Sequence, residues 1–281
     1  MKMKERSSAN KTLLYFTVPT VILMAITSSI GIWYPDFYAR ETIDWVAQSI
    51  GQDISNLFIV VPVLIISAIF SSKGSRTAKL IWAGTMTTNI YAYVIYTFAV
   101  HFNFLFHVYC LILGLSLYSV ICFFMNHVKE NFSKWFTEKA PTRAVGIFLL
   151  VIAVLFVLLW LSQSLPAALS NTVPESIVKD GLLTNPVHAL DLSFYLPLMG
   201  IAAVMILKKK TLGFLLAPVM IVFSIMTGLN ILSLMIVSMT LMPSNNLPMI
   251  IGFSALTLIC LGFLWLFLRR IRGAESADRC M

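Results

Sequence analysis

The sequence predicts an all-α membrane protein with eight transmembrane helices and with both termini in the cytoplasm. Hydrophobic residues make up 59% of the 281 residues and charged residues only 11%, whereas about 25% of the residues of a typical soluble domain are charged. Several apolar stretches also reach the roughly 20 residues that a helix needs to cross a bilayer. Lysine and arginine fall between these stretches in the alternation that a single chain orientation produces.

Each predicted span is a helix, because unpaired backbone groups cannot remain in lipid and the apolar runs are too long and uniform for barrel strands. The first run reaches from Leu13 to Trp33. It exceeds the core of a signal peptide, which has about 7–15 residues, so we interpret it as a retained span. The eight predicted spans lie near residues 12–34, 51–71, 80–100, 104–126, 145–163, 186–207, 213–238 and 248–268.

Two segments between the spans are amphipathic. The segment from Asp36 to Ile50 mixes charges with apolar residues such as Trp45, which predicts a short helix lying on the outer surface. The loop near residues 127–144 is basic and contains Trp135, and we expect it to lie on the inner surface.

The orientation follows from the basic residues. If the N-terminus is inside, every lysine and arginine except Arg40 and Lys179 falls in a cytoplasmic segment, as the positive-inside rule requires. The net charge of +8 is therefore explained by topology, and nucleic acid is not an expected partner. The expected partner is the lipid bilayer, and nothing in the short loops implies a soluble protein partner.

The chain is predicted to form a single membrane domain, within which a parallel repeat of four plus four spans is compatible with the sequence. Both sets of four spans begin inside, as such a repeat requires. Pro62 precedes Lys73 by the same distance that Pro197 precedes Lys208. Proline is common in membrane helices, so a chain without duplication stays an alternative. The repeat halves would be residues 1–140 and 141–281.

Polar residues within the apolar spans form the candidate functional site, because such residues are costly in lipid and usually face protein or water. At about 1.5 Å of rise per residue, five spans place polar groups at a similar depth near the outer face. This layer predicts a cavity open to the outside and lined by spans two, three, four, six and seven. The candidate ligand-binding residues are Gln52, Asp53, Tyr93, Asn103, His107, His188 and Asp191.

Span six carries the clearest pattern. Asn185 and Pro186 form a typical helix start, and His188 and Asp191 follow on one helix face, three residues apart. We expect Asp191 to be the charged centre of the site and His188 its proton partner, with the other candidates orienting a ligand. The alternative is that Asp53 only caps span two.

A metal site is only weakly indicated. His107, His188, Asp53 and Asp191 are residue types that bind zinc, but the sequence has no HExxH motif and no clustered cysteine–histidine spacing. It also lacks the GxxxxGK[ST], GxGxxG and GxSxG motifs of nucleotide-binding and hydrolytic sites. The sequence therefore leaves the catalytic residues and any cofactor unknown, and it favours a protein that is not an enzyme.

Several short motifs resemble uncharacterised multi-pass membrane proteins of bacteria, over most of residues 50 to 240. The resemblance implies a bacterial inner (cytoplasmic) membrane but attaches no activity to the chain. The motifs are Gly51-Gln52-Asp53, Tyr91-x-Tyr93, His101-x-Asn103-x-Leu105-Phe106 and Asn185-Pro186-Val187-His188-x-x-Asp191.

Three functional classes remain open from the sequence. The first is a protein that binds, translocates or senses a small solute or ion through the outer cavity, and the polar layer favours it. The second is a membrane-embedded hydrolase with a metal held by the same residues. The third is a structural or accessory membrane subunit in which the polar layer only ties helices together.

Overall fold

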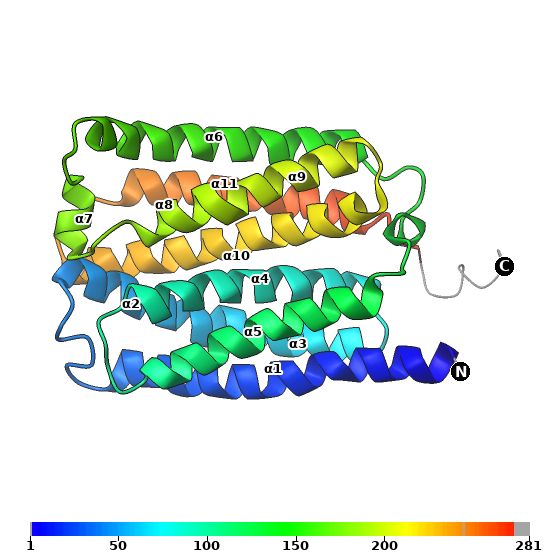
Figure 1. Ribbon diagram of the computed structural model, residues 1–281, viewed down its shortest axis with the longest axis horizontal. Coiled ribbons are helices and arrows are strands. Elements are labelled where there is room, and N and C mark those ends of the chain that lie inside the picture. Colours follow the sequence, from blue (N-terminus) through cyan, green and yellow to red (C-terminus); the bar gives the residue numbers. More distant parts are fainter. Residues whose placement is uncertain (1, 244, 273–281) are drawn as a thin grey trace.

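Long helices run side by side along the longest axis of the molecule (Figure 1). The computed structural model describes residues 2–243 and 245–272, with side chains from Leu13 onward. All the named elements of this part of the chain are helices, and Phe136 and Ile271 form an isolated bridge. The structure therefore confirms the all-helical class.

The first half of the chain forms four antiparallel rods. The second of these rods contains a π-helical segment between two α-helices. The elements are α1 (Lys2–Trp33), α2 (Ile43–Ser55), η1 (Asn56–Val60), α3 (Val61–Ser72), α4 (Arg76–Phe98) and α5 (Phe106–His127).

The second half repeats this order of rods, with one short additional helix before the interrupted rod. A single 3-10 turn, η2 (Phe132–Trp135), lies in the loop that joins the two halves. The elements of the second half are α6 (Thr142–Leu169), α7 (Glu175–Asp180), α8 (Pro186–Leu190), η3 (Asp191–Tyr195), α9 (Leu196–Leu207), α10 (Thr211–Leu241) and α11 (Leu247–Leu268).

Seven of the rods in the described residues are long and apolar enough to cross a membrane, as a multi-pass membrane protein requires. The remaining rod, α4, has 23 residues but is more polar. Its polar side chains include Thr85, Thr88 and Asn89, all of which are buried. Because α4 packs between α3, α5 and α10, these side chains contact other helices, and the helix does not need an apolar surface.

The start of α1 and the end of α11 lie at the same end of the bundle (Figure 1). The loops at this end carry most of the described lysines and arginines, including Lys73, Lys134 and Lys208; we call it the basic end. The opposite end carries α7 (Figure 1) and is mainly acidic, and we call it the α7 end. The side chains of residues 2–12, and Arg279 in the basic tail, lie outside the described residues.

The separate surface helix predicted for Asp36 to Ile50 is wrong. Residues 34–42 form a loop, and α2 begins at Ile43 and continues through η1 and α3 as one rod of 30 residues. The charge of Asp44 suggested a surface helix, but this carboxylate pairs with Lys179 of α7 over 2.9 Å. The rest of α2 packs between α1 and α10.

The loop between α5 and α6 closes the basic end. We expected this loop to lie on the membrane surface, but Phe132 and Trp135 are buried. The ring of Phe136 lies 4.6 Å from the ring of Phe267 in α11. The aromatic side chains of the loop bury more apolar area inside the bundle than they would at an interface, and this accounts for the difference.

Helix α10 joins the two halves by packing against α2 and α4. Two glycines allow this close approach. A Cβ on Gly51 would lie 2.5 Å from the Cα of Leu234, and a Cβ on Gly84 would lie 2.5 Å from the Cβ of Val222. The Ser233 hydroxyl also donates to the Gly51 carbonyl over 2.7 Å. Small residues at helix contacts are typical of membrane bundles.

We predict that Gly51→Ala lowers the thermal stability of the purified protein, by about 1–3 kcal/mol, because the added methyl group overlaps the α10 backbone. Gly200→Ala is the matched control, since a Cβ there meets nothing within 4 Å. A differential scanning measurement in detergent would compare the two variants. An equal effect of both substitutions would contradict the close packing of α2 on α10.

Candidate functional site

Two rods are interrupted in the same way. In each, a π-helical segment of five residues is followed by an α-helix with proline at its second position, Pro62 in α3 and Pro197 in α9. Proline lacks an N–H and its ring clashes with the carbonyl four residues before it. A wider π turn accommodates both effects, and such turns occur frequently at functional sites. Asn56 and Asp191 are the first residues of the two π segments.

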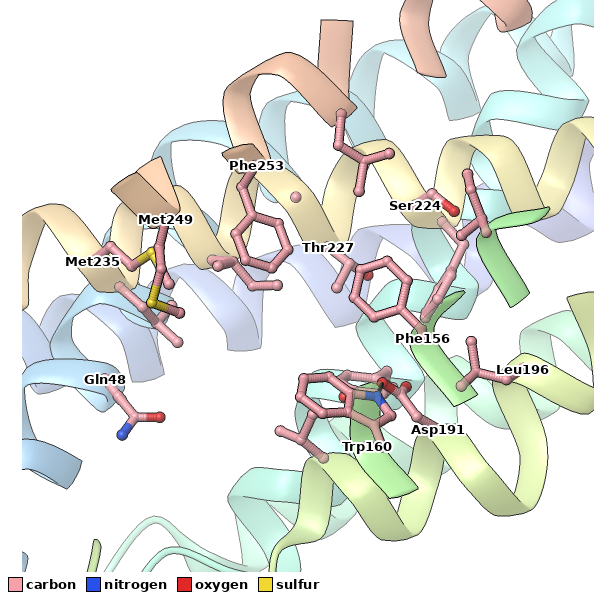
Figure 2. A pocket seen from close by; sticks show the side chains of 18 of the residues that line it. Gln48, Phe156, Trp160, Asp191, Leu196, Ser224, Thr227, Met235, Met249 and Phe253 are labelled. Atoms are coloured by element: carbon pink, nitrogen blue, oxygen red, sulfur yellow. Dashed lines mark hydrogen bonds between the residues drawn. The ribbon is translucent and has the colours of Figure 1, made fainter. Parts of the chain in front are cut away.

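Asp191 is held by neutral donors. The indole Nε1–H of Trp160 in α6 donates to Asp191 Oδ2 over 2.8 Å, and the Tyr91 side chain of α4 approaches the same carboxylate. Figure 2 shows the Trp160 ring lying directly against Asp191. A carboxylate in an apolar region needs such donors, because an unpaired buried charge is very costly.

The Asp191 carboxylate faces a cavity of about 370 Å³. This volume falls in the range of small-molecule sites, about 300–1,000 Å³. Helices of the second half form nearly all of the cavity, and α2 and α4 add one residue each. It is lined by Gln48, Tyr91, Ile152, Phe156, Trp160, Val187, Asp191, Leu196, Met199, Phe223, Ser224, Thr227, Gly228, Ile231, Leu234, Met235, Ser238, Asn246, Met249, Phe253 and Leu256.

The cavity wall is mainly aromatic and aliphatic. Phe156 and Phe253 lie on either side of Thr227 in Figure 2, and Met235 and Met249 lie together beyond Phe253. The hydroxyl of Thr227 is buried and has no hydrogen-bond partner. An apolar wall with a few polar groups is the usual composition of a small-molecule pocket.

The cavity lies where α6 and α11 diverge. The rings of Phe148 and Phe263 stack with centroids 4.0 Å apart and join these two helices nearer the basic end. Toward the α7 end the distance between facing rings increases, to 6.5 Å for Phe156 and Phe253. Met249 lines the cavity and is 52% exposed, so the cavity opens in this half of the bundle.

The His188 side chain forms no hydrogen bond with the Asp191 carboxylate, although the Asp191 backbone N–H donates to the His188 carbonyl. Its ring stacks on the Trp160 ring with centroids 4.4 Å apart, and its backbone N–H donates to Asn185 Oδ1 over 3.0 Å. The predicted helix start at Asn185 is thus confirmed. The structure places Trp160, not His188, against the carboxylate.

Asp53 lies in a different cluster. Its side chain is 2% exposed and accepts hydrogen bonds from the Tyr38 hydroxyl over 2.6 Å and from the Tyr96 hydroxyl over 2.7 Å. The rings of Tyr93 and Tyr109 pack beside Tyr96, with centroids 5.2 and 5.1 Å away. These four tyrosines seal the carboxylate among α1, α2, α4 and α5, and we call this group the tyrosine cluster.

The protonation state of Tyr38, on the loop side of the tyrosine cluster, follows from its burial. Tyr38 lies in the loop between α1 and α2, and burial together with the nearby Asp53 charge raises its pKa well above the ordinary value. The phenol therefore stays protonated and donates to the carboxylate. Asp53 itself lies ten residues after the start of α2, or about 15 Å along the rod, so its predicted capping role is wrong.

The remaining candidates do not line the cavity, and Asn103 borders the tyrosine cluster at Tyr109. Gln52 donates to Asn56 Oδ1 over 2.9 Å. Asn103 accepts from the Leu105 N–H over 2.9 Å and stabilises the turn before α5. His107 is exposed and packs edge-on against Phe106. Of the seven predicted site residues, only Asp191 lines the cavity, and the expectation of one shared cavity is wrong.

Trp160 is the residue of the site that sequence reasoning missed. It stands three residues before the predicted end of span five, where a tryptophan is typical of the aromatic belt. Because α6 continues to Leu169, Trp160 instead lies inside the helix and faces Asp191. The sequence signal that could have identified Trp160 as a site residue is a tryptophan within a largely aliphatic run.

The candidate metal ligands are not brought together. Among the described residues, no group of three or more histidine, cysteine, aspartate or glutamate side chains could hold a metal ion. Asp53 and Asp191 belong to separate clusters, and His107 faces away from both.

Helix α7 covers the bundle beside the cavity mouth. Gln48, which lines the cavity, donates to Asp180 Oδ1 over 3.0 Å, and Lys179 pairs with Asp44. Burial, with the Asp44 charge as a second cause, raises the pKa of Asp180 to about 6. The docking of α7 on α2 therefore includes a carboxyl group that titrates near neutral pH.

We predict that Tyr96→Phe destabilises the protein by about 1–3 kcal/mol, because it removes a donor from a buried carboxylate. The same substitution should cost less in an Asp53→Asn background, where the acceptor carries no charge. Thermal unfolding of the four variants in detergent measures this coupling. Additive effects would contradict the hydrogen bond between these side chains.

We predict that the docking of α7 weakens above pH 6. The folded chain binds the Asp180 proton more tightly than the unfolded chain, whose aspartate pKa is about 4. The resulting stabilisation is complete below pH 4 and is lost as the pH rises through 6. Asp180→Asn should flatten the dependence of Tm on pH between 4 and 8, by no more than about 1 kcal/mol after solvent screening. Asp36→Asn, at another loop of the α7 end, is the control.

Comparisons with known proteins identify no relative of this chain. The chain matches no known protein family, and no curated protein and no solved structure is similar to it. The function is therefore inferred from the cavity beside Asp191.

Proposed function

We propose that the chain is a transport protein of the cell membrane that binds a small solute in the cavity beside Asp191 and moves it across the bilayer. One observation carries the proposal: a carboxylate at a π-helical interruption faces an open, apolar-walled cavity. Charged groups inside membrane spans usually mark solute or ion pathways.

The proposal includes eight spans with both termini in the cytoplasm. Helix α4 is the eighth span, and its 23 residues are enough to cross the hydrocarbon core. The basic end faces the cytoplasm, in accordance with the positive-inside rule. The α7 end then faces outward, so the cavity receives its solute from the outer side.

An internal duplication supports transport. The π segments that start at Asn56 and Asp191 are 135 residues apart in the sequence, and so are the starts of α4 and α10, Arg76 and Thr211. Both rods also share the five-residue π segment and the proline at the second position of the helix that follows it. Repeated halves with interrupted helices are a common architecture of transporters.

The two halves would have diverged in role. Tyr96 and Ile231 occupy equivalent positions of α4 and α10, again 135 residues apart. In the first half the Tyr96 ring fills the interior and binds Asp53. In the second half Ile231 lines the cavity. The first half therefore stabilises the bundle, and the second half binds the solute.

The basic end is closed in this state. Gly146 and Gly213 bring α6 and α10 against α9, where an added Cβ would lie 2.5 Å from the nearest atom. The aromatic loop around Trp135 covers the same end. A solute could thus enter from the α7 end and would leave only after α9 moves, for which the π segment supplies a flexible point.

The other two classes have less support. A metal-dependent hydrolase would need three ligands around an open position, and the candidate ligands lie apart. A purely structural role fits the tyrosine cluster, whose donors and acceptor are matched. It does not account for the cavity beside Asp191.

Cysteine labelling tests both the orientation and the cavity. In a background without native cysteines, we predict that Met235→Cys reacts with a membrane-impermeant thiosulfonate added to intact cells, because Met235 lines the cavity. Met226→Cys on the same helix is the matched control, since Met226 is buried and should not react.

Two exposed positions report the orientation. Val173→Cys, at the α7 end, should react from outside, and Lys208→Cys, at the basic end, should react only in inverted vesicles. The reverse pattern would overturn the orientation. An unreactive Met235→Cys beside a reactive Val173→Cys would overturn the outward-open cavity.

A further inference from the structure

We propose that the solute is an amphiphilic organic cation, in which an ammonium or similar head group is attached to an apolar body. This inference rests on the proposed function and names the ligand class of the same cavity. It is carried by the charge, the ring geometry and the wall composition of the cavity.

The charge of the cavity favours a cation. Asp191 is the only ionisable acid or base among the lining residues apart from the Tyr91 phenol, and no lysine or arginine lines the wall. The donor on the carboxylate, the Trp160 indole N–H, is neutral. A cationic ligand would supply the opposite charge that a carboxylate in an apolar region requires. An anion would meet repulsion from Asp191.

Several aromatic rings lie in the cavity wall with the carboxylate. Trp160 contacts Asp191 through its indole N–H, and Phe156 lies 5.9 Å from Trp160, measured between ring centroids. Phe253 faces Phe156 across the cavity. Aromatic rings attract cations within about 6 Å of the ring centroid, and quaternary ammonium groups are commonly bound in this way.

The wall disfavours a bare metal cation. Hard cations take six or more oxygen ligands, whereas the cavity offers one carboxylate and a few hydroxyl and amide groups. Met235, Met249 and Leu256 line the remainder and fit an apolar body. Methionine side chains adapt to ligands of different shape, so the wall suits a class of compounds rather than one compound.

The route of entry also fits an amphiphile. The cavity lies between α6 and α11, which meet at the stack of Phe148 on Phe263 and diverge beyond it. Met249 is 52% exposed at this divergence. A cation that concentrates near the bilayer surface would thus reach the cavity between these two helices.

Binding of tetraphenylphosphonium to the purified full-length protein tests the proposal, with benzyltrimethylammonium as a smaller cation. Tetraphenylborate has the shape of the first probe and the opposite charge. The protein is reconstituted in nanodiscs of neutral lipid, and radiolabelled probe is measured by scintillation proximity. Each probe is measured in a separate assay, because tetraphenylborate forms an insoluble ion pair with tetraphenylphosphonium. We expect saturable binding of at least one cation and no saturable binding of tetraphenylborate.

Substitutions at the two buried aspartates distinguish a loss of charge in the cavity from a loss of folding. Asp191→Asn should weaken cation binding at least tenfold, as expected for the loss of a desolvated charge partner. Asp191→Glu should restore part of the affinity. Asp53→Asn is the matched control, because it neutralises a buried aspartate outside the cavity, and it should change binding less than twofold. Size-exclusion profiles check that each variant is folded.

Two results would overturn the inference. One is saturable cation binding that Asp191→Asn leaves unchanged, or saturable binding of tetraphenylborate with an affinity like that of the cations. The other is a failure of both cations to bind the wild-type protein. Either result would contradict only the ligand class if Met235→Cys still reacts from the outer side. An unreactive Met235→Cys would instead contradict the outward-open cavity and with it the proposed function.

Discussion

A carboxylate within a membrane-spanning helix must find hydrogen-bond donors or an opposite charge, because lipid supplies neither. Two aspartates of this chain impose that constraint, and the structure meets it in two ways. Asp53 receives hydrogen bonds from two tyrosine hydroxyls and is sealed. Asp191 receives an indole N–H and keeps one side open to a cavity. The position of the surrounding aromatic residues follows from these two requirements.

The two halves surround their buried aspartates in different ways. In the first half, aromatic rings fill the interior and tie α1, α2, α4 and α5 around Asp53. In the second half, α6 and α11 meet at one phenylalanine stack and then diverge. Helix α10 belongs to both environments, since it packs on α2 and α4 and also lines the cavity.

The sequence predicted the class of the fold and the position of every long helix, because apolar length and the alternation of basic residues are set by the bilayer. It did not predict the site. The sequence predicted Asp53 near the start of span two, because the polar residues before it do not continue the apolar run. The helix in fact begins at Ile43. Trp160 was missed because a tryptophan near the end of a span is typical of the aromatic belt at the membrane surface. Depth along a span was predictable, but the direction in which each side chain faces depends on helix packing, which one sequence does not specify.

The π segment η3 sets the direction of Asp191 relative to α9. A π turn contains one residue more than an α turn, and one residue corresponds to a rotation of about 100° around the helix axis. The extra residue lets the Asp191 carboxylate, at the start of η3, face the cavity while α9 keeps its buried face against α6. Removing a single residue from this segment would restore a regular helix and turn the carboxylate away. The orientation of the Asp191 side chain is therefore set by the length of η3, in addition to the identity of its first residue.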